Sequence, residues 1–286
     1  MFKREVDYMN KLFEKNSKLM PLSAVVLAIL SILIEFLLNI LAPDGLGYYS
    51  IPKIILMTMM KLVLSVIFIV IASKLYEIKI GFGKKKLVKG IFWYGLLLCI
   101  VSIIDLVGTY TKPEIGFIEA LPVLGLIFIF SMSIGLYEEI VYRGFIFGSF
   151  RKHFGESKKG IYLSVLLSSF VFGCAYLTNY ILAPELVISA ITQVFYAFFI
   201  GVFLAVIYYR TENLLPCIIL HGIYNFAVYF WFCFAKDIIK MLNMSTTDMD
   251  IVSALVVIVS NSLFLIAGLL QLRKEFNNKS VNSIVK

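Results

Sequence analysis

The residues of this chain best suited to chemistry lie in the stretch "GLYEEIVYRGF", positions 135–145. Glu138, Glu139 and Arg143 place three ionisable groups within six residues, and long apolar segments flank them on both sides. On insertion scales an ionisable group at the centre of a membrane helix costs about 2.5–3.5 kcal/mol. Groups retained at that cost are functional candidates by default.

Helical spacing separates the two glutamates. Glu139 and Arg143 are four residues apart, in the order that favours an ion pair on one helical face. Glu138 is rotated about 100° from Glu139, and its neighbour four residues on is the uncharged Tyr142. A buried carboxylate without a cation is a candidate general base that takes a proton from water. The alternative is that both glutamates serve Arg143 in a structural role.

A second candidate pair lies in "HGIYN", positions 221–225. His221 and Asn225 are also four residues apart, and they combine a group that titrates near neutrality with an amide donor. Together they can stabilise a developing oxyanion or position a substrate carbonyl, although a buried histidine is more often structural. From the helical rise, both lie at a depth similar to that of Glu138, so we expect one shared pocket.

The helices that must position these side chains are membrane spans. The chain has 286 residues, of which 60% are hydrophobic and 15% charged, with a mean hydropathy of +0.93. This composition indicates an integral membrane protein, and about 20 apolar residues cross the hydrocarbon layer as a helix. We predict an all-α polytopic fold with about eight transmembrane helices. The predicted spans are 19–42, 51–76, 90–110, 119–149, 161–180, 186–208, 213–235 and 249–271.

The distribution of basic residues predicts the topology. With the N-terminus inside, the inner segments hold 19 of the 26 Lys and Arg residues, as expected from the excess of positive charge in cytoplasmic loops. We therefore expect both termini to be cytoplasmic, with an N-terminal segment 1–18, one membrane domain 19–271 and a tail 272–286. The net charge of +8 reports topology and contact with the lipid bilayer, and it gives no support for binding of nucleic acid.

The cysteines are interpreted as small core residues. All four lie in apolar spans without CxxC spacing, so they suggest neither disulfides nor a metal site. They are Cys99, Cys174, Cys217 and Cys233.

Three motifs together resemble the CPBP family of CAAX proteases and bacteriocin-processing enzymes, also called Abi or type II CAAX prenyl protease-like proteins. The EExxxR motif of that family is similar to "EEIVYR" (138–143), its FxxxH motif to "FGCAY" (172–176), and its HxxxN motif to "HGIYN" (221–225). The resemblance covers about residues 119–235, the expected protease-like core. The outer helices share only the expected topology.

The resemblance implies an intramembrane endopeptidase that needs no metal or other cofactor. Glu138 would activate water, while His221 and Asn225 would stabilise the oxyanion. Glu139 and Arg143 would support the site. The implied substrate is a hydrophobic or lipidated peptide or protein, and we expect the enzyme in the plasma membrane of a bacterium.

One position departs from the family pattern, because Tyr176 stands where the FxxxH histidine is expected. A tyrosine hydroxyl can orient water by hydrogen bonding, but as a neutral group it is a poor proton acceptor. The change also removes a candidate ligand from any zinc site, which needs three protein ligands. We therefore predict no bound metal.

Two other functions remain open. A catalytically degenerate relative would act as a membrane scaffold or an immunity protein that binds a membrane-protein partner, and Tyr176 motivates this reading. A transporter would use the buried charges of Glu35, Lys61 and Asp105. These three could equally pair with one another between the first three spans.

Overall fold

The computed structural model describes residues 19–41, 49–182, 184–243 and 248–284, and within these ranges it contains helices and turns but no strand. The all-α membrane fold predicted from the sequence is confirmed, and among the described residues six helices are long and apolar enough to cross a membrane. The predicted N-terminal segment 1–18 lies outside the described residues.

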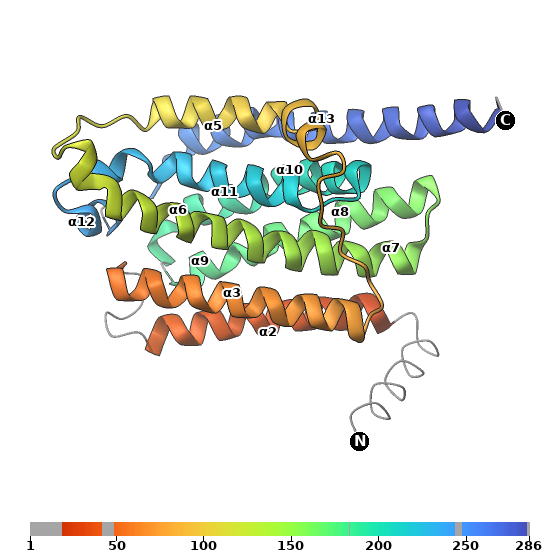
Figure 1. Cartoon of the computed structure of the whole chain (residues 1–286), viewed down its shortest axis with the longest axis horizontal. Helices are drawn as coiled ribbons and strands as arrows, with labels where there is room; N and C mark the ends of the chain where they lie inside the picture. Colours follow the sequence, from red (N-terminus) through yellow and green to blue (C-terminus); the bar gives the residue numbers. More distant parts are fainter. Residues whose placement is uncertain (1–18, 42–48, 183, 244–247, 285–286) are drawn as a thin grey trace, which may run out of the picture.

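The six long spans form a bundle whose helices run roughly along one direction (Figure 1). They are α2 (Leu19–Leu41), α3 (Ile51–Lys74), α6 (Phe117–Glu139) continued by η2 (Ile140–Phe147) and α7 (Gly148–Phe154), α8 (Lys158–Ala175), α10 (Val187–Thr211) and α13 (Ile251–Ile284). The shorter elements α9 (Leu177–Leu182), η3 (Pro184–Leu186) and α12 (Ile238–Asn243) lie between them in the chain.

The other two predicted spans are not single long helices. Residues 87–108 form α4 (Leu87–Lys89), the π-helical turn η1 (Gly90–Tyr94) and α5 (Leu96–Gly108), with a bend of 64° at the break. The segment 213–235 contains only the 15-residue α11 (Leu215–Tyr229), followed by the 3₁₀ turn η4 (Trp231–Phe234). In the part of the chain that the structure describes, six helices could thus span a membrane, or seven if the bent pair counts as one span. Apolar composition alone does not reveal where an apolar run bends.

Helix α10 occupies the centre of the bundle. It packs along α13 on one side and α8 on another, and α11 packs mainly on α6 and α5. From Phe199 to Thr211 every residue of α10 is buried. Helices α2 and α3 lie on the opposite side of the bundle from α13 and contact the α6–η2–α7 rod (Figure 1). The EEIVYR motif (138–143) in this rod therefore lies between the α2–α3 pair and the remaining helices.

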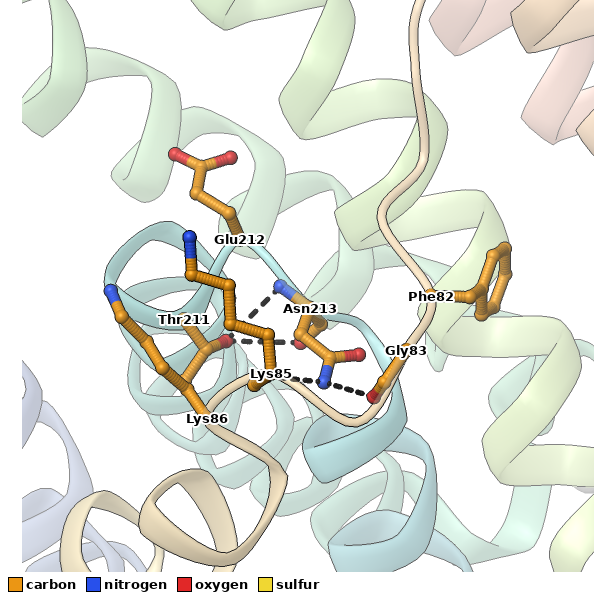
Figure 2. A pocket seen from close by; sticks show the side chains of 7 residues that line it. All are labelled: Phe82, Gly83, Lys85, Lys86, Thr211, Glu212 and Asn213. Carbon is orange, nitrogen blue, oxygen red and sulfur yellow. Dashed lines mark hydrogen bonds between the residues drawn. The ribbon is translucent and has the colours of Figure 1, made fainter.

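Polar contacts fasten one end of the bundle at the turn between α10 and α11. The amide of Asn213 donates hydrogen bonds to the backbone carbonyls of Gly83 (2.7 Å) and Lys85 (2.9 Å), as Figure 2 shows. The chain passes so close that a Cβ atom at Gly81 would lie 2.1 Å from the carbonyl oxygen of Glu212. Glycine is therefore required at position 81, because any side chain would displace the turn.

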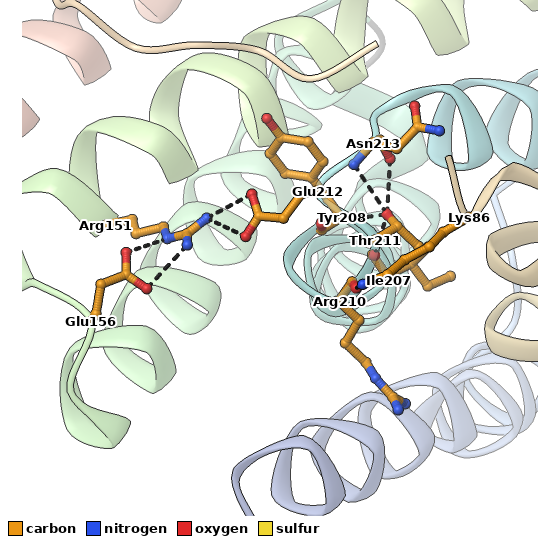
Figure 3. Close-up of polar contacts among 9 residues, drawn as sticks. All are labelled: Lys86, Arg151, Glu156, Ile207, Tyr208, Arg210, Thr211, Glu212 and Asn213. Atoms are coloured by element: carbon orange, nitrogen blue, oxygen red, sulfur yellow. Dashed lines mark hydrogen bonds and ion pairs between the residues drawn. The ribbon is translucent and has the colours of Figure 1, made fainter. Parts of the chain in front are cut away.

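Charged side chains extend this fastening to three neighbouring helices (Figure 3). Arg151 of α7 donates to Glu156 and, across the bundle end, to Glu212 at 2.9 Å. Arg210 of α10 pairs with Glu275 of α13 at 3.2 Å. These contacts fix how far α7, α10 and α13 can slide past one another.

Candidate functional site

The site begins with a close contact between α6 and α11 through two glycines. A Cβ atom at Gly135 would lie 2.8 Å from the backbone nitrogen of Gly222, and one at Gly222 would lie 2.4 Å from the sulfur of Met132. Small residues at a helix interface let two backbones approach closely. Since Glu139 lies one turn after Gly135 and His221 adjoins Gly222, this contact brings the two motif segments together.

The predicted ion pair between Glu139 and Arg143 is confirmed and is almost completely buried. Arg143 Nη1 lies 2.8 Å from Glu139 Oε1, and the side chains are 1% and 0% exposed. The same oxygen contacts Nδ1 of His221 at 2.8 Å. One carboxylate oxygen therefore joins the arginine of η2 to the histidine of α11.

Arg143 also packs against the aromatic ring of Phe172. The Arg143 guanidinium lies 4.2 Å from the ring centroid of Phe172 on α8, within the range of a cation–π interaction. A Cβ atom at Gly201 on α10 would approach Arg143 Nη2 to 3.4 Å and Ser169 Cβ to 3.1 Å. Helices α8 and α10 thus close over the ion pair and keep lipid and water from it.

Glu138 points to a different place, as its rotation around the helix requires. Its Oε2 lies 3.5 Å from Nε2 of His221 and 3.5 Å from the Tyr176 hydroxyl, and its side chain is 16% exposed. Glu138 and Tyr176 line a cavity of about 140 Å³ together with Tyr142, Phe172 and five further residues. Glu138 is therefore the motif carboxylate that a bound water or substrate can reach.

Tyr176 occupies the place beside Glu138 where the motif comparison expects a histidine. It follows the last residue of α8, Ala175, and its ring packs edge to face on Phe172 with centroids 5.5 Å apart. Its hydroxyl can donate a hydrogen bond to the Glu138 carboxylate at 3.5 Å. The group next to the Glu138 carboxylate is thus a phenol.

Asn225 is not brought into these contacts. It lies one turn beyond His221 on α11 and is half-buried, and it makes no hydrogen bond to any residue in the described ranges. It is also absent from the residues that line the cavity. Its role in oxyanion binding remains a prediction.

Glu35 of α2 is a cavity residue that sequence reasoning did not assign to the site. It lines the same cavity as Glu138 and pairs with Lys61 of α3 at 2.6 Å. The sequence showed both as buried charges, and the expectation that they pair between spans is confirmed for these two. Asp105 joins no ion pair in the part of the chain that the structure describes. Nothing in the sequence could indicate that α2 turns Glu35 toward the motif.

Outside this site the described residues offer no second ligand site of comparable chemistry. Among the described residues no three His, Cys, Asp or Glu side chains are arranged to bind a metal ion. A cavity of about 240 Å³ lies between the 82–86 loop and the α10–α11 turn. The Asn213 amide and the Thr211 hydroxyl there are engaged in hydrogen bonds to the chain itself (Figure 2). That cavity is therefore a structural junction.

Comparison with known proteins identifies the part of the chain that contains the motifs. Residues 120–227 match the family described as type II CAAX prenyl endopeptidase Rce1-like. No curated protein and no solved structure matched the chain. The matched range contains all six predicted site residues and excludes Glu35 and Lys61. Residues 120–227 thus match a Rce1-like type II CAAX prenyl endopeptidase domain, and this domain lies within a multi-pass, all-helical membrane protein.

Proposed function

We propose that the chain is an intramembrane endopeptidase that uses Glu138 to hydrolyse a peptide bond in a membrane-associated peptide or protein. The observation that supports it is the line of contacts from Arg143 through Glu139 and His221 to Glu138. It ends at a cavity inside the Rce1-like domain. A buried array that leads to one accessible carboxylate is the arrangement that general-base catalysis requires.

In the first step the Glu138 carboxylate takes a proton from water, and the resulting hydroxide attacks the carbonyl carbon of the scissile bond. The carbonyl π electrons move to oxygen and form an oxyanion. When this intermediate collapses, the C=O bond re-forms and the C–N bond breaks. The proton held on Glu138 passes to the leaving nitrogen, so one water is added across the peptide bond.

We assign to His221, in the doubly protonated form, the role of stabilising the oxyanion. Nδ1–H then donates to Glu139 at 2.8 Å, and Nε2–H lies 3.5 Å from Glu138, the carboxylate that lines the cavity. With Arg143 also positive and both glutamates negative, the four groups carry no net charge. A neutral set is the least costly arrangement for charges removed from water. Asn225 would add an amide donor to the same oxyanion.

The substrate is proposed to be hydrophobic or lipidated. The cavity wall includes Ile32, Phe172 and Ala175, and the matched family is described as a prenyl endopeptidase. We place the enzyme in the plasma membrane of a bacterium, where lipid-embedded peptides reach the site from the bilayer. No cofactor takes part in the proposed reaction.

The proposal is tested with quenched fluorescent peptides in proteoliposomes, with and without a farnesylated cysteine. Glu138→Gln keeps the shape of the side chain but removes the base, so cleavage should fall by about 10²- to 10⁴-fold. The matched control is Glu119→Gln, because Glu119 is exposed in the first turn of the same helix. Cleavage that continues unchanged in Glu138→Gln would overturn the proposal.

Tyr176 favours a second candidate, a degenerate relative that keeps the fold as a scaffold or immunity protein. The phenol lies 3.5 Å from Glu138 and lines the cavity where a proton acceptor is expected. Tyr176→His separates the two candidates. Increased cleavage would identify a weakened protease. Absence of cleavage in both forms, with a membrane protein retained by wild type and Glu138→Gln alike, would support the scaffold.

A further inference from the structure

The cavity beside Glu138 contains a second carboxylate from outside the Rce1-like domain. Glu35 lies on α2, more than 80 residues before the matched range begins, yet it lines the cavity together with Glu138 and Tyr176. The three side chains come from α2, α6 and the end of α8. The site is therefore completed by a helix that the domain itself does not include.

Glu35 is held in place by a cation that serves both it and the motif helix. Lys61 Nζ lies 2.6 Å from Glu35 Oε2, with side chains 7% and 20% exposed. The same ammonium lies 4.9 Å from the ring centroid of Tyr137, which precedes Glu138. The Tyr137 hydroxyl donates to Ser31 of α2 at 2.8 Å. These contacts fix α2 and α3 against α6 at the level of the proposed base.

Lys61 also reduces the electrostatic repulsion between the two carboxylates that line this cavity. Two carboxylates that line one small cavity repel each other when both are ionised. Lys61 offsets that repulsion at Glu35, so Glu35 can stay an acceptor while Glu138 gains and loses a proton. A carboxylate accepts several hydrogen bonds, so the contact with Lys61 leaves capacity for a water molecule.

We propose that Glu35 positions the attacking water in place of the histidine that Tyr176 replaces. The water directs one hydrogen to Glu138, which removes it, and the other to Glu35, which accepts a hydrogen bond without taking the proton. The lone pair on oxygen is then aimed at the substrate carbonyl carbon. This inference rests on the proposed peptidase function, and it adds a positioning residue that the family domain does not contain.

The opposing explanation is that Glu35 only neutralises Lys61. A charge-neutral pair of substitutions separates the two roles, because Glu35→Gln with Lys61→Met removes both charges at once. If neutralisation is the whole role, the double variant recovers the wild-type kcat. If Glu35 orients water, kcat stays about 10- to 100-fold below wild type, with KM within about twofold.

Back-substitution gives the sharper measurement. If Glu35 serves in place of the missing histidine, Tyr176→His should restore most of the kcat lost in Glu35→Gln, whereas a structural defect would not be repaired from α8. All variants are assayed on the same quenched peptide in proteoliposomes, with thermal melting to verify folding. If Glu35→Gln alone fails to fold, the double variant carries the test.

The outcomes are distinguishable from failure of the proposed function. If cleavage survives in Glu138→Gln, both the proposed peptidase mechanism and the proposed role of Glu35 are wrong. Activity lost in Glu138→Gln but unchanged in Glu35→Gln, or recovered in the charge-neutral double variant, overturns only the role of Glu35.

Discussion

Two buried ion pairs lie near Glu138, and they differ in how they are built. Glu139 and Arg143 lie four residues apart on one rod and are 0% and 1% exposed. Glu35 and Lys61 join two helices, and Glu35 is 20% exposed where it borders the cavity. The first pair is sealed inside the domain, while the second borders the space where a substrate would bind.

The difference shows what each pair can contribute. A sealed pair is fixed by its surroundings and can orient a neighbour, as Glu139 orients His221 through Nδ1. A pair at a cavity wall has one face available to water or substrate. Burial therefore separates support from chemistry more clearly than the presence of charge does.

The largest effect is expected from breaking the sealed pair. Arg143→Met removes the arginine partner of the buried Glu139 carboxylate, and removal of one partner of a buried pair costs about 3–5 kcal/mol. Thermal melting in detergent should show a large fall in Tm. Arg151→Met is the control, because Arg151 pairs with glutamates at the exposed bundle end, where such pairs contribute about 0–1 kcal/mol. Equal losses in the two variants would contradict the comparison.

The second-largest effect is expected from disrupting the glycine contact between α6 and α11. In Gly135→Ala the new methyl group would lie 2.8 and 2.9 Å from backbone atoms of α11, so the helices must separate. Overpacking of this kind costs about 1–3 kcal/mol, and the His221–Glu139 contact should lengthen with loss of cleavage. Gly125→Ala lies on the same helix in open space and should leave both Tm and cleavage unchanged. A silent Gly135→Ala would show that the close approach is not needed.

The Glu35–Lys61 pair at the cavity should tolerate the loss of its cation better than the Glu139–Arg143 pair does. Lys61→Met leaves Glu35 without its cation, but Glu35 borders the cavity and can be hydrated there. We expect a loss of about 1–2 kcal/mol, smaller than for Arg143→Met. Urea or SDS titration of both variants measures the difference. A loss as large as that of Arg143→Met would mean that Glu35 is sealed from water.

The smallest effect is expected at a carboxylate that is stabilised without a cation. Desolvation opposes ionisation of Asp248, but the Ser189 hydroxyl and the N–H groups of Ile188, Ser189 and Met249 together lower its pKa to about 2. Its stabilising effect is therefore fully present above about pH 4 and is lost as the pH falls toward 2. Asp248→Asn should lower Tm at neutral pH, and this difference should shrink over that interval. A constant difference would exclude the carboxylate as its cause.

The parts predictable from sequence were those that depend on local spacing or composition. The Glu139–Arg143 pair follows from helical periodicity, and the all-α membrane class follows from hydropathy. The bend at Gly95 and the early end of α11 were missed, because apolar residues satisfy lipid and protein neighbours equally well. The position of Glu35 was also missed, since it depends on how α2 rotates against α6, and no spacing within either helix encodes that angle.

The short helix α11 has a consequence for the surrounding lipid. Its 15 residues span only about 22 Å, less than the roughly 30 Å of a typical hydrocarbon layer. A bilayer meets such mismatch by thinning locally, which would bring headgroups and water closer to the level of His221. The acyl-chain length of the host membrane should therefore tune hydrolysis, with short-chain lipids easing the approach of polar peptide segments and long-chain lipids hindering it.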